Sequence, residues 1–383
     1  MQDDSPPPPR LIDTPEQLEQ LVEDLSGQPG CLAVDTEFVW ERTYYPALGI
    51  VQLGTDDGEV FLVDAHTLED LAPLGRLLSD PHSTKILHDA QQDLTILRRE
   101  TGAYPRNVFD TRCAAAFAGL SSTLSLRDLL SELLEIELNK SETRADWLQR
   151  PLSESMVVYA AEDVLYLSRA RQALLRRVEE RGRLDWLEDE LAGFDRESLY
   201  DERDPREQYL RVKGCGRLNP VELATLRELA AWREETARRR DRPRSHVASD
   251  GLLLNLAQRR PQRPEQLEGL RDMSSRKAAQ YGEAMLAAVA VALNLPAAQH
   301  PPSMRRRRDE ARLRQRLGQA IDHLRSQSEA AGLDPPFVAS RAELKALARD
   351  PAGDGEGHRV LRGWRRDFLG TELHGMLKAP DEA

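Results

Sequence analysis

Two carboxylic acids, Asp35 and Glu37, stand two residues apart at the end of the apolar run Cys31–Phe38. If this run forms a β-strand, residues i and i+2 leave the same face, so both carboxylates project toward one point. Two negative charges at one point favour a divalent cation, because Mg²⁺ and Mn²⁺ prefer oxygen ligands and leave positions open for water and phosphate. A solvated strand end would look the same, so the prediction depends on further carboxylates.

Three more residues are expected to reach the same point. Asp93 falls one turn into a predicted helix that follows the short strand 85–88, and such a helix can bring its first turn back over the strand ends. Tyr159 and Asp163 are four residues apart, so they share one face of a helix. Each could alone be a solvated charge or a half-buried aromatic. Together, four carboxylates and a phenol favour a metal-dependent site.

The elements that must position these residues alternate between strands and helices. Strands are predicted at residues 31–38, 49–54, 59–63 and 85–88, with Asp56-Asp57-Gly58 as a hairpin turn. Helices are predicted at residues 68–78, 89–99, 111–118, 125–134 and 153–180. Asp89 and Ser153 are the expected N-caps of the second and the last of these helices. The pattern indicates an α/β domain that begins with a hairpin sheet.

The motifs around these residues resemble those of the ribonuclease D family. The resemblance extends over residues 11–180, and the segments that carry it are Val34–Phe38, Thr43–Pro46, Val51–Leu53, His88–Leu97, Asp146-Trp147, Pro151-Leu152 and Tyr159–Asp163. A tyrosine four residues before the last aspartate is typical of the tyrosine subgroup of the DEDD exonucleases. The resemblance implies a ribonuclease H-like fold, a mixed sheet flanked by helices, and 3′ to 5′ exonuclease activity.

The resemblance also implies a role for each residue of the constellation. Asp35 would bridge two divalent metal ions, Mg²⁺ or Mn²⁺, while Glu37 and Asp163 would complete the first site and Asp93 would anchor the second. Tyr159 would orient the attacking water. A phenol with a pKa of about 10 is a poor base at neutral pH, so the metal would promote loss of the proton.

Three further residues in the motifs are candidates to contact the terminal nucleotides of a substrate. They are Phe38, which would stack on a base, Gln52 and His88. All three could instead be packing or strand-end residues.

Charge is divided unequally along the 383 residues. The net charge is −12, but residues 1–202 carry −21 and residues 203–383 carry +9. An acidic half that gathers metal ions and a basic half that attracts polyanions suit an enzyme acting on nucleic acid, although charge can also vary between domains without such a role. Three widely spaced cysteines, and no apolar run long enough to cross a membrane, lead us to expect a cytoplasmic protein.

The second half is expected to be helical. Residues 203–294 resemble the HRDC domain, a small helical module that binds nucleic acid, and residues 309–378 resemble a second, more divergent copy. The segment 295–308 between them is a basic linker whose run Arg305–Arg308 either contacts RNA phosphates or is merely solvated. Before these parts, we expect a disordered tail at residues 1–10 and an exonuclease domain at residues 11–195.

The sequence thus predicts a monomeric 3′ to 5′ exoribonuclease whose partner is RNA, with the 3′ ends of tRNA precursors as the substrate class that the resemblance implies. One alternative is a related exonuclease that prefers DNA, since no residue reveals a contact with a 2′-hydroxyl. Another is a non-catalytic RNA-binding scaffold, which the presence of all five site residues disfavours.

Overall fold

The computed structural model describes residues 7–138, 142, 145–303, 310–349 and 357–378. The chain divides into two compact units. The first comprises residues 1–39, 48–200 and 309–383, and the second comprises residues 40–47 and 201–308. Residues 1–6 of the predicted tail and the run Arg305–Arg308 lie outside the described residues.

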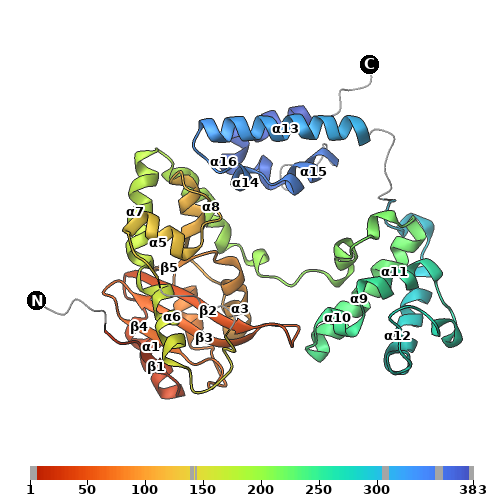
Figure 1. Ribbon diagram of the computed structural model, residues 1–383, viewed down its shortest axis with the longest axis horizontal. Coiled ribbons are helices and arrows are strands. Elements are labelled where there is room, and N and C mark those ends of the chain that lie inside the picture. The colour runs from red at the N-terminus through yellow and green to blue at the C-terminus, as the bar shows by residue number, and fades with distance from the viewer. Residues whose placement is uncertain (1–6, 139–141, 143–144, 304–309, 350–356, 379–383) are drawn as a thin grey trace, which may run out of the picture. The chain divides into compact units, whose positions relative to one another are not determined.

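The first unit is built on a six-stranded mixed sheet with the order β1-β4-β3-β2-β5-β6 (Figure 1). The strands are β1 (Arg10–Ile12), β2 (Gly30–Val39), β3 (Ala47–Thr55), β4 (Val60–Val63), β5 (Ser83–Leu87) and β6 (Val108–Asp110). β1 is parallel to β4, β5 is parallel to both β2 and β6, and β3 is antiparallel to β4. The mixed sheet flanked by helices, expected from the motifs, is confirmed.

Both faces of the sheet are covered, because its side chains alternate between two hydrophobic cores. On β2, Leu32 and Val34 pack on one face and Ala33 on the other. The first face carries α1 (Pro15–Leu25), α2 (Leu74–Ser79) and α3 (Gln91–Thr101). The second face carries α4 (Thr111–Phe117), α5 (Leu126–Leu134), α6 (Glu154–Leu165), α7 (Leu167–Glu180) and α8 (Leu184–Leu191). By this alternation, Asp35 and Glu37 belong to the second face.

Local sequence signals located several of these elements correctly. Residues 56–58 turn between β3 and β4, where Thr55 N–H donates to the carbonyl oxygen of Glu59 over 3.0 Å. Ser153 caps α6, and its hydroxyl accepts the backbone N–H of Met156 over 3.2 Å. The interiors of α4 and α5 also match the predicted ranges.

Other predictions were wrong, each for a physical reason. Asp89 does not cap α3: its φ of +65° places it in the left-handed region, and its carboxylate pairs with Arg112 instead. The predicted helix 153–180 is two helices, α6 and α7, which meet at Tyr166 with φ −105° and ψ 0°. The predicted helix 68–78 forms only at its end, as α2. Arg10, assigned to the tail, begins β1.

The C-terminal helices belong to the first unit rather than standing apart. They are α13 (Glu310–Ala330), α14 (Pro335–Val338), α15 (Arg341–Arg349), α16 (Gly363–Arg365) and α17 (Thr371–Leu377). Trp364 stacks on Trp186 of α8 with ring centroids 5.4 Å apart, and its indole N–H donates to Glu190 over 3.0 Å. Phe117 of α4 contacts Trp364 edge-on at 4.9 Å. A shared aromatic core therefore joins these helices to the sheet domain.

The second unit is a helical domain with its own core, formed by α9 (Pro220–Arg240), α10 (Arg244–Val247), α11 (Asp250–Arg259) and α12 (Ser275–Leu293). Ser249 caps α11, and its hydroxyl accepts the backbone N–H of Leu252 over 3.1 Å. The loop of residues 40–47, between β2 and β3, clusters with this unit. There the hydroxyl of Tyr44 donates to Glu234 and accepts from Arg244 over 3.0 Å. Among the described helices of the whole chain, none is long and apolar enough to cross a membrane.

Candidate active site

Three of the predicted carboxylates come together at the end of β2. One oxygen each from Asp35, Glu37 and Asp163 lie within 4.8 Å of one another. Asp35 and Glu37 are half-buried and leave the same face of β2, as their spacing requires. Asp163 is 9% exposed and comes from α6, which packs on that face.

Asp93 approaches the group from α3, on the opposite side of β2. Its carboxylate is 8% exposed and accepts a hydrogen bond from the hydroxyl of Thr36, the residue between Asp35 and Glu37. Asp93 is the third residue of α3, where the partial positive charge of a helix N-terminus favours a carboxylate. It is not within ligand distance of all three other acids, but its charge acts on both Asp35 and Glu37.

The four carboxylates repel one another in a partly desolvated place. Burial, and then the charges of Asp163 and Asp93, raise the pKa of Glu37 to about 8. Burial and the same neighbours raise the pKa of Asp35 well above its usual value. Burial also raises the pKa values of Asp93 and Asp163, against hydrogen bonds from Thr36 and Tyr159 respectively. No lysine or arginine in the described ranges forms an ion pair with any of the four.

This donor set fits divalent metal ions. Clustered carboxylate oxygens without a cationic partner are what hard cations bind, and a cation would relieve the repulsion that raises these pKa values. Asp35, Glu37 and Asp163 together could offer ligands to one ion, and the charge of Asp93 acts on Asp35 from the α3 side.

Tyr159 lies one turn before Asp163 on α6 and hydrogen-bonds to its carboxylate. The Tyr159 ring packs at 6.0 Å from the ring of Trp147, which is 1% exposed. The phenol is thus held by its neighbours on both the ring and the hydroxyl side. It points at the same carboxylates that would hold the ions.

Close packing between β3 and the segments around α6 sets the position of Tyr159 and Asp163. A Cβ on Gly49 would stand 2.5 Å from the carbonyl oxygen of Trp147, so only glycine fits there. A Cβ on Gly54 would stand 3.1 Å from the carbonyl oxygen of Val164. Arg150, just before α6, pairs with the buried Asp64 over 2.6 Å and donates to the Gly49 carbonyl oxygen over 2.9 Å.

The three residues expected to contact nucleotides differ in their surroundings. Phe38 is half-buried at the end of β2 and packs against the core beneath α1–α3. Gln52 is fully buried, and neither of its side-chain amide atoms has a hydrogen-bond partner among the described residues. With no exposed surface, Gln52 is not placed to touch a nucleotide.

His88 is engaged within the protein. Its Nε2 lies 3.1 Å from the carbonyl oxygen of Leu124 and its Nδ1 lies 2.8 Å from the hydroxyl of Thr111. Because a carbonyl can only accept, Nε2 carries the proton, and Nδ1 lies at hydrogen-bond distance from the Thr111 hydroxyl, which also lies 3.1 Å from the carbonyl oxygen of Leu87. Burial lowers the pKa of His88 to about 4, so the ring is neutral. Both ring nitrogens are therefore used in holding the strand end that precedes α3.

Sequence reasoning missed the residues that hold the acids in place. Thr36 is hidden inside the Asp-Thr-Glu motif, yet strand alternation could have shown that it points toward the opposite face, where Asp93 lies. Arg150 and Gly49 carry no local signal, because their partners lie about 86–101 residues away in the chain.

Comparison with known protein families identifies two regions of the chain. Residues 9–179 match the family model described as 3′-5′ exonuclease, and residues 222–289 match the HRDC domain. The first match contains all five residues of the predicted constellation. The second falls on α9–α12 of the second unit.

Curated relatives share most of the chain. The chain is 40% identical to ribonuclease D of Desulfotalea psychrophila, over 94% of this chain and 96% of the relative. It is 39% identical to ribonuclease D of Pseudomonas paraeruginosa, over 91% and 92% of the two chains.

Two solved structures are similar to this chain in fold and sequence. The crystal structure of Escherichia coli RNase D, described as an exoribonuclease involved in structured RNA processing, superimposes with a TM-score of 0.86 at 30% identity, covering 96% of this chain and 98% of that one. The catalytic core of RRP6 from Trypanosoma brucei gives a TM-score of 0.59 at 25% identity, covering 76% of this chain and 81% of that one. DEDD exonucleases use divalent metal ions in a two-metal mechanism. The chain therefore belongs to the ribonuclease D family and is a 3′-5′ exoribonuclease.

Proposed function

We propose that Asp35, Glu37, Asp93 and Asp163 hold the two divalent metal ions of this exoribonuclease, Mg²⁺ or Mn²⁺. The observation that carries this proposal is the meeting of three ligand oxygens within 4.8 Å, next to the buried Asp93. Bound divalent ions supply a water of lowered pKa and charge stabilisation for in-line displacement at phosphorus. Asp35 would face both ions, because the charges of both Asp93 and Asp163 act on its carboxylate.

Tyr159 orients the attacking water in this proposal. Its hydroxyl already lies at hydrogen-bond distance from the Asp163 carboxylate, and the Trp147 ring restricts its motion. A neutral phenol at pH 7 can donate one hydrogen bond and accept another, which is enough to fix a water beside a ligand carboxylate. It does not need to ionise.

We propose Phe38 as the residue that stacks on a terminal base, since it follows Glu37 directly and is only half-buried. Gln52 and His88 support the site from inside. His88 ties the end of β5 to α4 through Thr111, and Gln52 is fully buried in β3.

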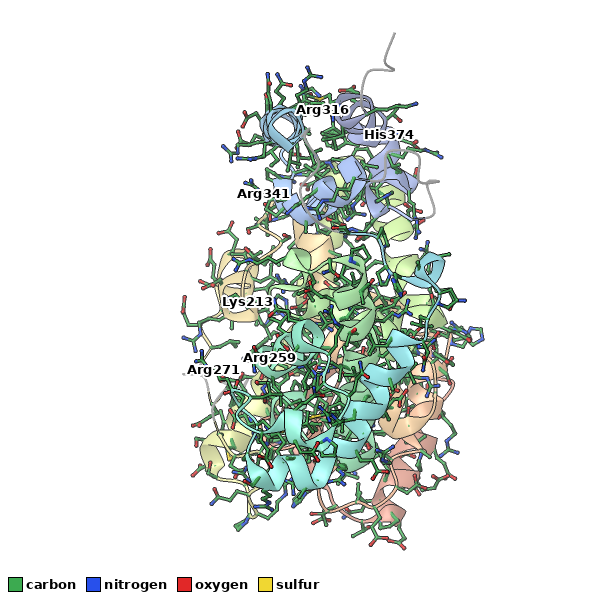
Figure 2. The ribbon with its side chains drawn as sticks, turned by 90° about the vertical axis from the view of Figure 1, so that its right-hand side faces the viewer. Lys213, Arg259, Arg271, Arg316, Arg341 and His374 are labelled. Carbon is green, nitrogen blue, oxygen red and sulfur yellow. The ribbon has the colours of Figure 1, made fainter. Side chains whose placement is uncertain are left out.

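The substrates proposed are structured RNAs, with the 3′ ends of tRNA precursors as the first class to test. HRDC domains bind nucleic acid, and the HRDC region carries most of the basic excess: residues 203–308 have 22 basic and 12 acidic residues, whereas residues 309–383 have 12 and 13. Lys213, Arg259 and Arg271 are exposed on this domain (Figure 2). Phosphate contacts from such residues give affinity without sequence preference.

We further propose that the protein acts as a monomer in the cytoplasm. Cys31, Cys113 and Cys215 are all free thiols, which suits a reducing compartment.

The test of this function is hydrolysis of one RNA hairpin with a single-stranded 3′ tail, labelled at either the 5′ or the 3′ end. We expect a 5′-labelled ladder that shortens stepwise and a 3′ label released as mononucleotide. A chelator should stop both, and Mg²⁺ should restore them. The same sequence as DNA should be degraded more slowly. Internal cleavage, or faster hydrolysis of DNA, would contradict the proposal.

A further inference from the structure

We propose that the C-terminal helices position the catalytic carboxylate Asp93 through a hydrogen-bonded chain, Asp334–Ser122–Arg112–Asp89, which makes Asp334 a remote positioning residue of the exonuclease centre. Asp334 directly precedes α14, and the other three surround the start of α3. The inference rests on the proposed role of Asp93 as a metal ligand.

The start of α3 has no cap of its own. Ala90 is its N-cap residue and offers no side-chain hydrogen bond. The backbone N–H of Ala90 donates instead to Asp110 at the end of β6, over 2.7 Å. Just before it, His88 is held by Thr111 and by the carbonyl oxygen of Leu124. The first turn of α3, which carries Asp93, is therefore fixed from outside by the segment 110–124.

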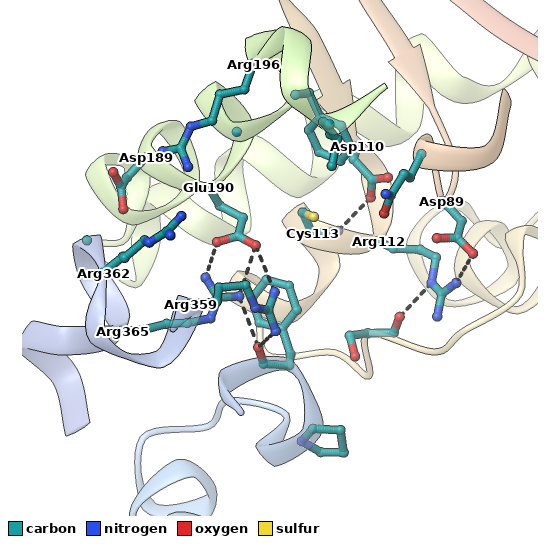
Figure 3. Close-up of a pocket in the computed structure, with 18 of the residues that line it drawn as sticks. Asp89, Asp110, Arg112, Cys113, Asp189, Glu190, Arg196, Arg359, Arg362 and Arg365 are labelled. Atoms are coloured by element: carbon teal, nitrogen blue, oxygen red, sulfur yellow. Dashed lines mark hydrogen bonds and ion pairs between the residues drawn. The ribbon is translucent and has the colours of Figure 1, made fainter. Parts of the chain in front are cut away.

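Arg112 connects this segment to α3 a second time. Its Nη1 pairs with Asp89, the left-handed residue at the turn into α3, and its Nε donates to the carbonyl oxygen of Ser122 over 2.7 Å. Figure 3 shows Arg112 beside Asp89. The guanidinium is planar, so the two bonds fix the orientation of Asp89 relative to Ser122.

Ser122 is in turn held by the C-terminal helices. Its backbone N–H and its hydroxyl both donate to the same oxygen of Asp334, over 2.9 and 2.7 Å. Asp334 stands at the N-cap of α14, where a carboxylate would ordinarily accept N–H groups of its own helix. Pro335 and Pro336 occupy the first two helical positions and have no N–H to offer. The Asp334 carboxylate is thus available for Ser122.

Three of the four hydrogen-bonded residues, Asp89, Arg112 and Ser122, line a cavity. The cavity has a volume of about 710 Å³ and is also lined by Phe337. Figure 3 shows Asp89 and Arg112 in this lining. Leu120 and Leu124 of the loop 119–125 pack against the core, whereas Ser122 between them is held by its hydrogen bonds to Arg112 and Asp334. Loss of the Asp334 bonds should release Ser122, then Arg112, and so loosen the turn at Asp89.

A loosened turn would affect catalysis because it would change the position of the Asp93 carboxylate. Asp93 lies in the first turn of α3 and is buried against Thr36, so a small shift of that turn changes the distance from its carboxylate to Asp35. Shifts of about 1 Å at a catalytic group can reduce rates by about 100-fold. For a remote residue we expect a decrease in kcat of about 10-fold, with KM for a short single-stranded RNA unchanged.

The experiment compares full-length Asp334→Ala, Asp334→Asn and wild type. Asparagine keeps an oxygen that can accept from Ser122, so it should restore most of the rate. The control is Asp189→Ala, which removes a hydrogen bond of 3.1 Å from the Trp364 backbone N–H. This bond also joins the C-terminal helices to the sheet domain, but it is not part of the series Asp334–Ser122–Arg112–Asp89. Each variant is assayed for kcat, for KM, for the Mg²⁺ concentration at half-maximal rate, and for amide hydrogen exchange of residues 88–97 without metal.

Asp334→Ala should speed hydrogen exchange in residues 88–97, raise the Mg²⁺ requirement and lower kcat, and Asp189→Ala should do none of these. Unchanged exchange in Asp334→Ala, or equal effects in Asp189→Ala, would overturn the positioning proposal. Faster exchange with unchanged kcat and Mg²⁺ requirement would also overturn the positioning role of Asp334, whereas a wild-type rate that needs no divalent ion would overturn the proposed metal site instead.

Discussion

Replacing Glu37 by glutamine should make the metal-free protein more stable while destroying its response to metal. Burial and neighbouring carboxylates raise the pKa of Glu37 from 4.5 to about 8. The stability that the protonated carboxyl gives is complete below pH 4.5 and is lost as the pH rises toward 8. One pKa unit corresponds to about 1.4 kcal/mol, so at pH 7 the raised pKa of Glu37 lowers the free energy of unfolding by about 3 kcal/mol. At pH 5 it lowers this free energy by less than about 1 kcal/mol.

The assay is thermal unfolding of the first unit within the full chain, in chelator, at pH 5 and pH 7. For a unit of this size we expect Glu37→Gln to melt about 5–10 °C above wild type at pH 7 and close to wild type at pH 5. Added Mg²⁺ should raise the melting temperature of wild type and hardly that of the variant. Glu41→Gln, at an exposed residue nearby, is the matched control and should change neither. A Glu37→Gln protein that melts at or below wild type at pH 7 would refute the reasoning that these carboxylates repel one another.

Three other predictions concern separate parts of the chain. Tyr159→Phe keeps the ring against Trp147, so kcat should decrease about 100-fold without loss of melting temperature; an unchanged kcat would show that the hydroxyl is dispensable. A chain ending at residue 303 exposes Phe117 and Trp186, which should cost about 3–5 kcal/mol and give a sheet domain that unfolds at lower denaturant; equal midpoints would contradict the shared core. Finally, each phosphate contact that is lost should reduce the logarithmic salt slope of RNA binding by about 0.7–0.9, and equal slopes would exclude the HRDC face as the RNA site. The variant to measure is the triple alanine substitution of Lys213, Arg259 and Arg271.

The parts of the site that could be predicted from sequence depend on short-range geometry. Asp35 and Glu37 share a strand face because side chains alternate, and Tyr159 and Asp163 share a helix face because they are four apart. Ser153 is recognisable as a cap because its partner, Met156, lies within the same turn. In each case the two residues that share a face or a hydrogen bond are only two to four positions apart in the sequence.

What could not be predicted depends on partners far along the chain. The rule that an acid before a helix caps it fails at Asp89, because Asp110 from β6 takes the N–H of Ala90 and leaves Asp89 to Arg112. Gln52 was predicted as a candidate to contact a nucleotide, but β3 lies inside a sheet that is covered on both faces. No pattern in the sequence around Gln52 indicates that its side chain is buried. The docking of the C-terminal helices on α8 likewise depends on Trp364, Trp186 and Glu190, whose sequence separation hides their contact.

The most direct test of the central claim is anomalous diffraction from crystals of the protein soaked in Mn²⁺, with a short RNA bound to an otherwise intact site. Four carboxylates converging from β2, α3 and α6 should hold two ions. We predict two anomalous peaks, one among Asp35, Glu37 and Asp163 and the other between Asp35 and Asp93. A single peak, or peaks away from these carboxylates, would contradict the account.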